Sequence, residues 1–169
     1  WMKDEMKDYY PEIHEKNVKL VGTPQFEFYL DENKVISRQR FGEKHGLDLD
    51  KKWICFSGDD ITTSPYDHLF LRDLAVSLND QKDDLQIIFR RCPVDLSQRY
   101  DEVLNEYNNL IVSIDPIWNI ESQTGWVGFF PKYEDILMQV NLSYHCDMVI
   151  NFGSTMAFDF AINNKNITG

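Results

Sequence analysis

A short polar stretch, Gly153-Ser154-Thr155, separates an apolar run from apolar residues at helical spacing. A glycine before a helix lets a ligand approach the main chain, and the first amides of a helix have no partners inside it. Two hydroxyls beside such amides suit an anion such as a phosphate group. The simpler alternative is that Ser154 only caps its helix. The residue types therefore predict an anion site at 153–155.

Two adjacent arginines, Arg90 and Arg91, follow the apolar stretch LQIIF. Arginine's planar guanidinium binds two oxygens of one phosphate group at once, so we expect one of the pair to face a bound phosphate. The alternative is a surface ion pair, which is common and contributes little to stability.

The small pair Ser57-Gly58 ends another apolar stretch, KWICF, and could hold the main chain close to a ligand. Asp59 and Asp60 come next and would repel a phosphate that they faced. We therefore expect these two acids to point to water or to cap the following segment.

Three further groups carry possible chemistry. Asp159 lies five residues beyond Ser154, within reach of a nucleoside sugar hydroxyl if a diphosphate sits at the helix start, and its alternative is a solvated helix acid. Glu134 and Asp135 complement the start of a helix better than they suit acid–base catalysis. Trp118 and Trp126 could stack on a base, although core or interface positions are commoner for tryptophan.

The composition excludes several classes of function. Seventeen basic residues against 28 acidic ones give a net charge of −11, which argues against nucleic acid as a partner. No apolar run is long enough for a membrane span, and the first ten residues are charged rather than signal-like. Three cysteines without paired spacing predict buried thiols in a cytoplasmic protein, and four scattered histidines predict no metal site.

Apolar strands alternate with amphipathic helices along the chain. Ser37 and Gly46 have the residue types of a helix N-cap and of the left-handed residue after a helix, and Ser64 is a second N-cap candidate. Strands are predicted over 17–24, 51–57, 84–92, 110–114 and 146–152, with a short extended piece inside 118–130. Helices are predicted over 37–46, 64–79, 95–109, 132–145 and 154–164.

Three helices have apolar residues on one predicted face. In the first these are Leu71, Leu74, Ala75 and Leu78; in the second Leu96, Tyr100, Val103, Leu104 and Tyr107; in the third Tyr133, Ile136, Leu137, Val140 and Tyr144.

This alternation predicts an α/β fold, a Rossmann-like open parallel sheet with helices on both faces. Ligands of such sheets bind beyond the carboxyl ends of the strands, so the functional candidates are the tips at 57–60, 90–93, 114–116 and 153–155. We expect one domain over 18–169, with 1–17 the end of a preceding lobe or a connecting helix, so that the chain is a fragment of a longer protein.

The segments KLVGTPQFEFY, KHGLDLDKKWICFSGDD, IIFRRCP and YEDILMQVNLSYHCDMVINFGSTMAFDFAINNK together resemble the second lobe of a GT-B-type bacterial glycosyltransferase. The resemblance is to surface-polysaccharide glycosyltransferases, to glycerophosphotransferases that use CDP-glycerol and, more distantly, to UDP-sugar 2-epimerases. Cys92 stands where these families often have histidine before proline.

The resemblance implies a lobe that binds a nucleoside-diphosphate sugar of the UDP or CDP type, without a metal or other cofactor, for transfer to a sugar or glycan acceptor. Gly153, Ser154 and Thr155 would hold the donor diphosphate with help from Arg90 or Arg91. Ser57 and Gly58 would line the nucleoside crevice, and Asp159 would meet the ribose. The catalytic base would come from the missing lobe, as would any membrane association. A non-catalytic α/β interaction module and an epimerase-like enzyme are the alternatives.

Overall fold

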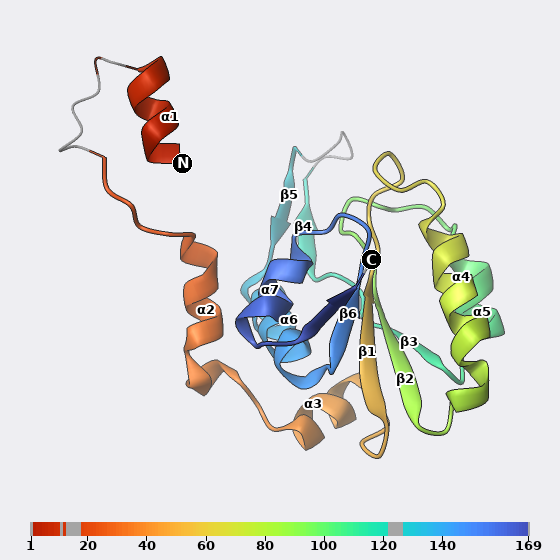
Figure 1. Cartoon of the computed structure of the whole chain (residues 1–169). Helices are drawn as coiled ribbons and strands as arrows, with labels where there is room; N and C mark the ends of the chain where they lie inside the picture. The colour runs from red at the N-terminus through yellow and green to blue at the C-terminus, as the bar shows by residue number, and fades with distance from the viewer. Residues whose placement is uncertain (1, 11, 13–17, 122–126, 169) are drawn as a thin grey trace.

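The chain folds around a five-stranded parallel sheet, as predicted (Figure 1). The computed structural model describes residues 2–10, 12, 18–121 and 127–168. The sheet has the order β3-β2-β1-β6-β7. Its strands are β1 (Lys52–Ser57), β2 (Leu85–Arg90), β3 (Ile111–Ser113), β6 (Met148–Ile150) and β7 (Asn166–Thr168).

The two longest strands, β1 and β2, lie side by side inside the sheet. Their residues are almost all buried. They pair in register, with Ile54 beside Ile87 and Phe56 beside Phe89. A near-continuous apolar strand is typical of a parallel sheet that is covered on both faces.

Helices cover both faces of the sheet, which confirms the predicted fold class (Figure 1). On one face lie α4 (Asp67–Leu78) and α5 (Asp101–Glu106), packed around Phe56, Leu71 and Phe89. On the other lie α3 (Arg38–His45), α6 (Tyr133–His145) and α7 (Met156–Ile162), packed around Trp53, Met138 and Phe160.

The segment before α3 contains the main error in the predicted secondary structure. Residues 18–23 form no strand, and Leu20 and Val21 are exposed, because no neighbouring strand is there to pair with them. Helix α1 (Met2–Tyr9) stands away from the sheet (Figure 1). Short helices follow at η2 (Pro24–Phe26), α2 (Glu27–Leu30) and η3 (Glu32–Lys34). The division at residue 17 stays a prediction.

Capping explains where the helices begin and end. Ser37 Oγ accepts from the Arg40 amide at 3.2 Å, and Gly46 adopts a left-handed φ of +69°, both as predicted. The Ser64 N-cap is wrong, because α4 begins only at Asp67. The Ser64 hydroxyl instead donates to Asp67 Oδ1 at 2.9 Å.

Two predicted helix faces are partly wrong. Leu96 is 52% exposed and lies outside α5, because the Asp95 carboxylate accepts from the Ser97 amide and holds a turn there. On α6, Tyr133 and Tyr144 are exposed by 53% and 49%, although they were placed on the buried face.

Three short strands complete the structure. β4 (Trp118–Ile120) and β5 (Phe129–Pro131) form an antiparallel pair where a short extended piece was predicted. Strand β7 was not predicted, because its exposed residues include only one apolar side chain, that of Ile167. The 3-10 helix η4 (Asn79–Gln81) follows α4.

Candidate functional site

A cavity of about 440 Å³ lies at the carboxyl edge of the sheet. It is formed by the ends of β1, β2 and β6. Here the chain order changes direction: β2 and β3 lie on one side of β1, and β6 and β7 lie on the other. Open α/β sheets bind their ligands at this position. We call it the tip cavity. Its lining residues are Ser57, Gly58, Asp59, Asp60, Thr63, Arg90, Arg91, Cys92, Pro93, Trp118, Gln139, Gly153, Ser154, Thr155 and Met156.

The structure brings together three of the four predicted tips. Tips 57–60, 90–93 and 153–155 line the tip cavity. The fourth tip contributes Asp115 and Pro116 to a neighbouring cavity of about 390 Å³, the outer cavity. Arg91, Pro93 and Trp118 line both cavities, so the two are adjacent.

The wall at 153–155 precedes α7 and carries the two predicted hydroxyls. The Met156 amide donates to Ser154 Oγ at 3.3 Å, but the N-cap of α7 is Thr155, so the alternative that Ser154 caps the helix is wrong. Helix α7 has only seven residues, so its dipole offers an anion less than the sequence indicated. Thr155 is exposed and lines the tip cavity.

The wall after β1 is close-packed. A Cβ on Gly58 would lie 2.8 Å from Tyr100 Oη and 3.2 Å from Phe89, so only glycine fits there. Asp60 caps the next segment as expected, because its Oδ1 accepts from the amides of Thr62 and Thr63. Hydrogen bonds from the Thr62 and Thr63 side chains lower the Asp60 pKa to about 2.

Asp59 differs from its prediction. It was expected to point to water or to cap, but it is only 8% exposed and lines the tip cavity. Its Oδ2 is buried without a hydrogen-bond partner. Burial is the main cause that raises the Asp59 pKa, and the charges of Asp67 and Asp60 raise it further.

Arg90 is the centre of a buried network rather than an exposed ion pair. Its Nη2 donates to both oxygens of Asp135 at 2.8 Å, and its Nη1 donates to the Ile114 carbonyl at 3.3 Å. Asp135 also accepts from the Ile117 amide and from Trp118 Nε1, each at 2.7 Å. The Arg90 charge is therefore neutralised at the edge of the cavity.

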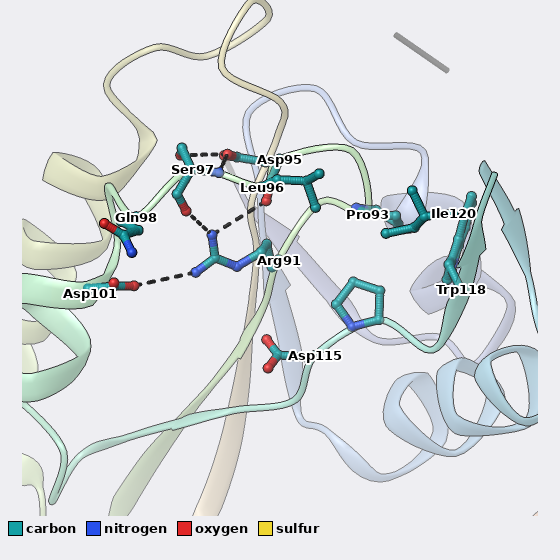
Figure 2. A pocket seen from close by; sticks show the side chains of 11 residues that line it. Arg91, Pro93, Asp95, Leu96, Ser97, Gln98, Asp101, Asp115, Trp118 and Ile120 are labelled. Carbon is teal, nitrogen blue, oxygen red and sulfur yellow. Dashed lines mark hydrogen bonds and ion pairs between the residues drawn. The ribbon is translucent and has the colours of Figure 1, made fainter. Parts of the chain in front are cut away.

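Arg91 lies in the wall of the outer cavity, where its guanidinium is bonded to the turn at 95–97 (Figure 2). Its Nη1 donates to the main-chain carbonyls of Asp95 and Ser97, and its Nη2 lies 3.8 Å from the Asp101 carboxylate. The guanidinium also lies 5.2 Å from the Tyr100 ring centroid. Its ion pair with Asp101 is longer and more exposed than the pair of Arg90 with Asp135, so Arg91 is the better candidate for an anion.

Asp159 is neither at the cavity wall nor a solvated acid. It is buried, and its Oδ2 accepts from Gln139 Nε2 at 2.6 Å. The hydroxyl of Tyr29, on α2, also bonds to Asp159, and burial raises the Asp159 pKa. Gln139 itself lines the tip cavity, so Asp159 lies behind it and orients its amide.

Sequence reasoning missed three lining residues, Thr63, Gln139 and Met156. Gln139 lies within an otherwise apolar stretch of α6, and that break in the apolar pattern was the available signal. Trp118, proposed as a base-stacking residue, lines both cavities, whereas Trp126 lies outside the described residues.

The described part of the chain contains no candidate metal site, and its cysteines are buried. No group of three His, Cys, Asp or Glu side chains there could hold a metal ion. The three cysteines are free and buried, as predicted, and burial raises the pKa of Cys92 to about 11. No helix in the same ranges has the length and apolar character to cross a membrane.

Comparison with known proteins supports the fold. Neither a protein-family model nor a curated protein sequence matches the chain. Among solved structures, S. aureus MnaA with UDP has 14% identity and a TM-score of 0.57 over 93% of this chain and 37% of its own. Wall teichoic acid polymerase TagF soaked with CDPG has 20% identity and a TM-score of 0.57 over 97% and 34%.

The UDP-GlcNAc 2-epimerase of Methanocaldococcus jannaschii has 15% identity and a TM-score of 0.58 over 98% of this chain and 43% of its own. The chain thus spans less than half the length of each of these structures. All three are GT-B-type proteins, so the expected GT-B relation is confirmed for the fold. This chain has the α/β fold of one part of a GT-B-type protein.

Proposed function

We propose that the tip cavity binds the diphosphate of a nucleotide sugar and that the chain is the donor-binding lobe of a glycosyltransferase for surface polysaccharide. The observation that carries the proposal is the single cavity into which three separately predicted strand tips converge. Solved structures of the same fold that were determined with UDP or after soaking with CDPG support this ligand class.

Each wall has a role in the proposal. The amides and hydroxyls of 153–155 bind the diphosphate, and Arg91 supplies the positive charge. Arg90 shapes the cavity edge through Asp135 and contributes less charge than the sequence predicted. Ser57 and Gly58 approach the nucleoside with their main chain, and Asp159 acts on it only through Gln139.

The proposed chemistry is stabilisation of a leaving group. Transfer of the sugar releases a nucleoside diphosphate, and groups fixed around that diphosphate stabilise the developing charge. A sugar or glycan acceptor and the base that activates it would come from the rest of a longer protein. We place the reaction in the cytoplasm, where free thiols like the three found here stay reduced.

Calorimetric titration with UDP-, CDP- and GDP-sugars tests the proposal. We expect heat of binding with a UDP or CDP donor. If none of the three classes binds at millimolar concentration, the proposal fails and the non-catalytic interaction module becomes the better hypothesis.

The double variant Ser154→Ala with Thr155→Ala tests the assigned wall. Loss of two hydroxyl contacts should raise the donor Kd about tenfold or more. The matched control is Ser77→Ala with Thr168→Ala, which removes two hydroxyls outside the tip cavity and should leave the Kd unchanged. Equal affinities for the two double variants would contradict the assignment.

An epimerase-like enzyme is the second candidate, because a UDP-GlcNAc 2-epimerase shares the fold and two acids, Asp59 and Asp60, line the cavity. Assay of the full reading frame for free UDP and epimerised sugar distinguishes the two. Epimerised product that disappears in an Asp59→Asn variant would favour this candidate over transfer.

A further inference from the structure

The Asp59 carboxylate is held in the tip cavity by its main chain. The Asp59 amide donates to Asp67 Oδ2 at 2.6 Å, and its carbonyl accepts from Arg99 Nη2 at 2.7 Å. The side-chain Oδ2 has no partner, and a Cβ built on Gly153 would lie 3.5 Å from it. A buried, unpaired carboxylate oxygen therefore lies beside the glycine of the proposed diphosphate wall.

The acids and cations around Asp59 do not neutralise it. Asp60 on its own loop and Asp67 on α4 are further negative charges. Arg99, from the turn before α5, is bound to Asp95 at 2.6 Å. On β2, Arg90 is paired with Asp135.

Two further neighbours of Asp59 stabilise its negative charge only weakly. Arg91, which follows β2, donates to main-chain carbonyls of the turn at 95–97. The Gly153 amide, from the loop before α7, is the uncharged group that favours the ionised form of Asp59. A buried carboxyl takes up a proton more readily than an exposed one.

Resting on the proposed function, we propose that Asp59 binds the donor as a carboxylic acid: diphosphate binding draws one proton from solvent onto Asp59, which then donates a hydrogen bond to a diphosphate oxygen. Two anions side by side in a half-enclosed cavity repel strongly. Protonation removes that repulsion and supplies the unpaired oxygen with a partner. Asp59 is thus a specificity-determining residue, because its carboxylic acid group recognises a diphosphate oxygen that can accept a hydrogen bond.

The structure favours a proton over a bridging cation. No group of three potential ligands lies together in the described residues, and Asp60, the nearest acid in sequence, has its oxygens bonded to Thr62 and Thr63. Burial and the charges of Asp67 and Asp60 already raise the Asp59 pKa before any ligand arrives, and the charge of a bound diphosphate raises it further.

The test is calorimetry of the 169-residue chain with UDP-glucose and CDP-glycerol between about pH 5 and pH 8, in two buffers of different ionisation enthalpy. The diphosphates of these probes are diesters and keep their charge over this range. Above the Asp59 pKa of the free protein, we expect uptake of about one proton per bound nucleotide and a Kd that rises up to about tenfold per pH unit. The proton uptake is obtained from the difference in binding heat between the two buffers. It is measured on the wild-type protein, so this test does not depend on whether a variant folds.

Two variants locate the proton. Asp59→Asn keeps the main-chain contacts, and its profile should be flat, without proton uptake. Asp60→Asn removes the same charge from the same wall, but Asp60 has a pKa of about 2 and stays ionised over this range, so the pH slope should remain.

Three results would overturn the inference. Binding without proton uptake leaves the proposed function standing and removes the role of Asp59. Binding that requires Mg²⁺ and takes up no proton assigns the position to a cation. No binding at any pH by the wild type or by Asp59→Asn removes the proposed function, and the inference with it.

Discussion

At the scale of residues, two adjacent arginines have different surroundings. Arg90 and Asp135 are both nearly fully buried, and each is bonded to further groups of the protein. Arg91 is half-buried and bonds mainly to carbonyls. Neighbours in sequence at the end of a strand point to opposite faces, which explains why one became structural and the other stayed available.

We expect Arg91→Lys, which keeps the charge but loses the planar fork, to raise the donor Kd about tenfold. Calorimetry measures it, and thermal unfolding confirms that the variant is folded. Arg72→Lys is the control, because Arg72 pairs with Glu102 and Glu106 away from the cavity. Unchanged donor affinity of Arg91→Lys would exclude Arg91 from the site.

Asp135→Ala should lower the free energy of unfolding by about 3–5 kcal/mol, because it leaves the buried Arg90 charge without its partner. Denaturant unfolding measures the loss. Glu134→Ala removes an exposed acid from the same helical turn and should cost less than about 1 kcal/mol. Equal losses for the two variants would mean that the ion pair does not stabilise the fold.

The residue types in the cavity walls were predictable, but their partners were not. Ser154 and Arg91 belong to residue types with known affinity for phosphate, and both line the cavity. The ion pair between Arg90 and Asp135 joins residues 45 positions apart, and no local pattern indicates it. The burial of Asp59 has a similar origin, since its main chain is held by Arg99, 40 positions away, as well as by the nearer Asp67.

At the scale of elements, the orientation of α6 follows from a buried polar residue and not from the periodicity of its apolar residues. Periodicity placed Tyr133 and Tyr144 on the buried face, yet the helix buries Asp135, Met138 and Leu142 instead. The Asp135 carboxylate is bonded to β2 and β4, which orients the first turn. The remaining turns follow this orientation.

This orientation predicts unequal costs along α6. Met138→Ala should lower the free energy of unfolding by about 2–5 kcal/mol, because the removed side chain leaves a cavity in the core. Tyr144→Ala should cost less than about 1 kcal/mol. Chemical denaturation measures both losses. A larger loss for Tyr144→Ala than for Met138→Ala would favour the buried face predicted from periodicity over the one observed.

Strong periodic elements were predictable and weak ones were not. The strands at 52–57 and 85–90 and the cap at Ser37 follow from local sequence alone. Strand β7 exists because β6 offers it an edge, and residues 18–23 have no such edge. Pairing partners decide such segments, and partners lie outside any local window.

At the scale of the whole molecule, all three cysteines are buried, Cys55 and Cys146 in the core and Cys92 in the wall of the tip cavity. Burial raises the pKa of Cys55 to about 12 and that of Cys92 to about 11. Thiolate is the reactive form, so at about pH 7 an aromatic disulfide reagent should not label the native protein but should label three thiols in denaturant. Rapid labelling of any thiol in the native protein would contradict this packing.

The central position of β1 has a consequence for folding kinetics. Its neighbour β6 arrives late: the Trp53 amide bonds to the Asp147 carboxylate, 94 positions further along the chain. Closing so long a loop is slow compared with forming the β1–β2 pair. On a ribosome, the early strands can therefore associate first, and the wall at 153–155 that we propose for the diphosphate is completed only when that later part of the chain emerges.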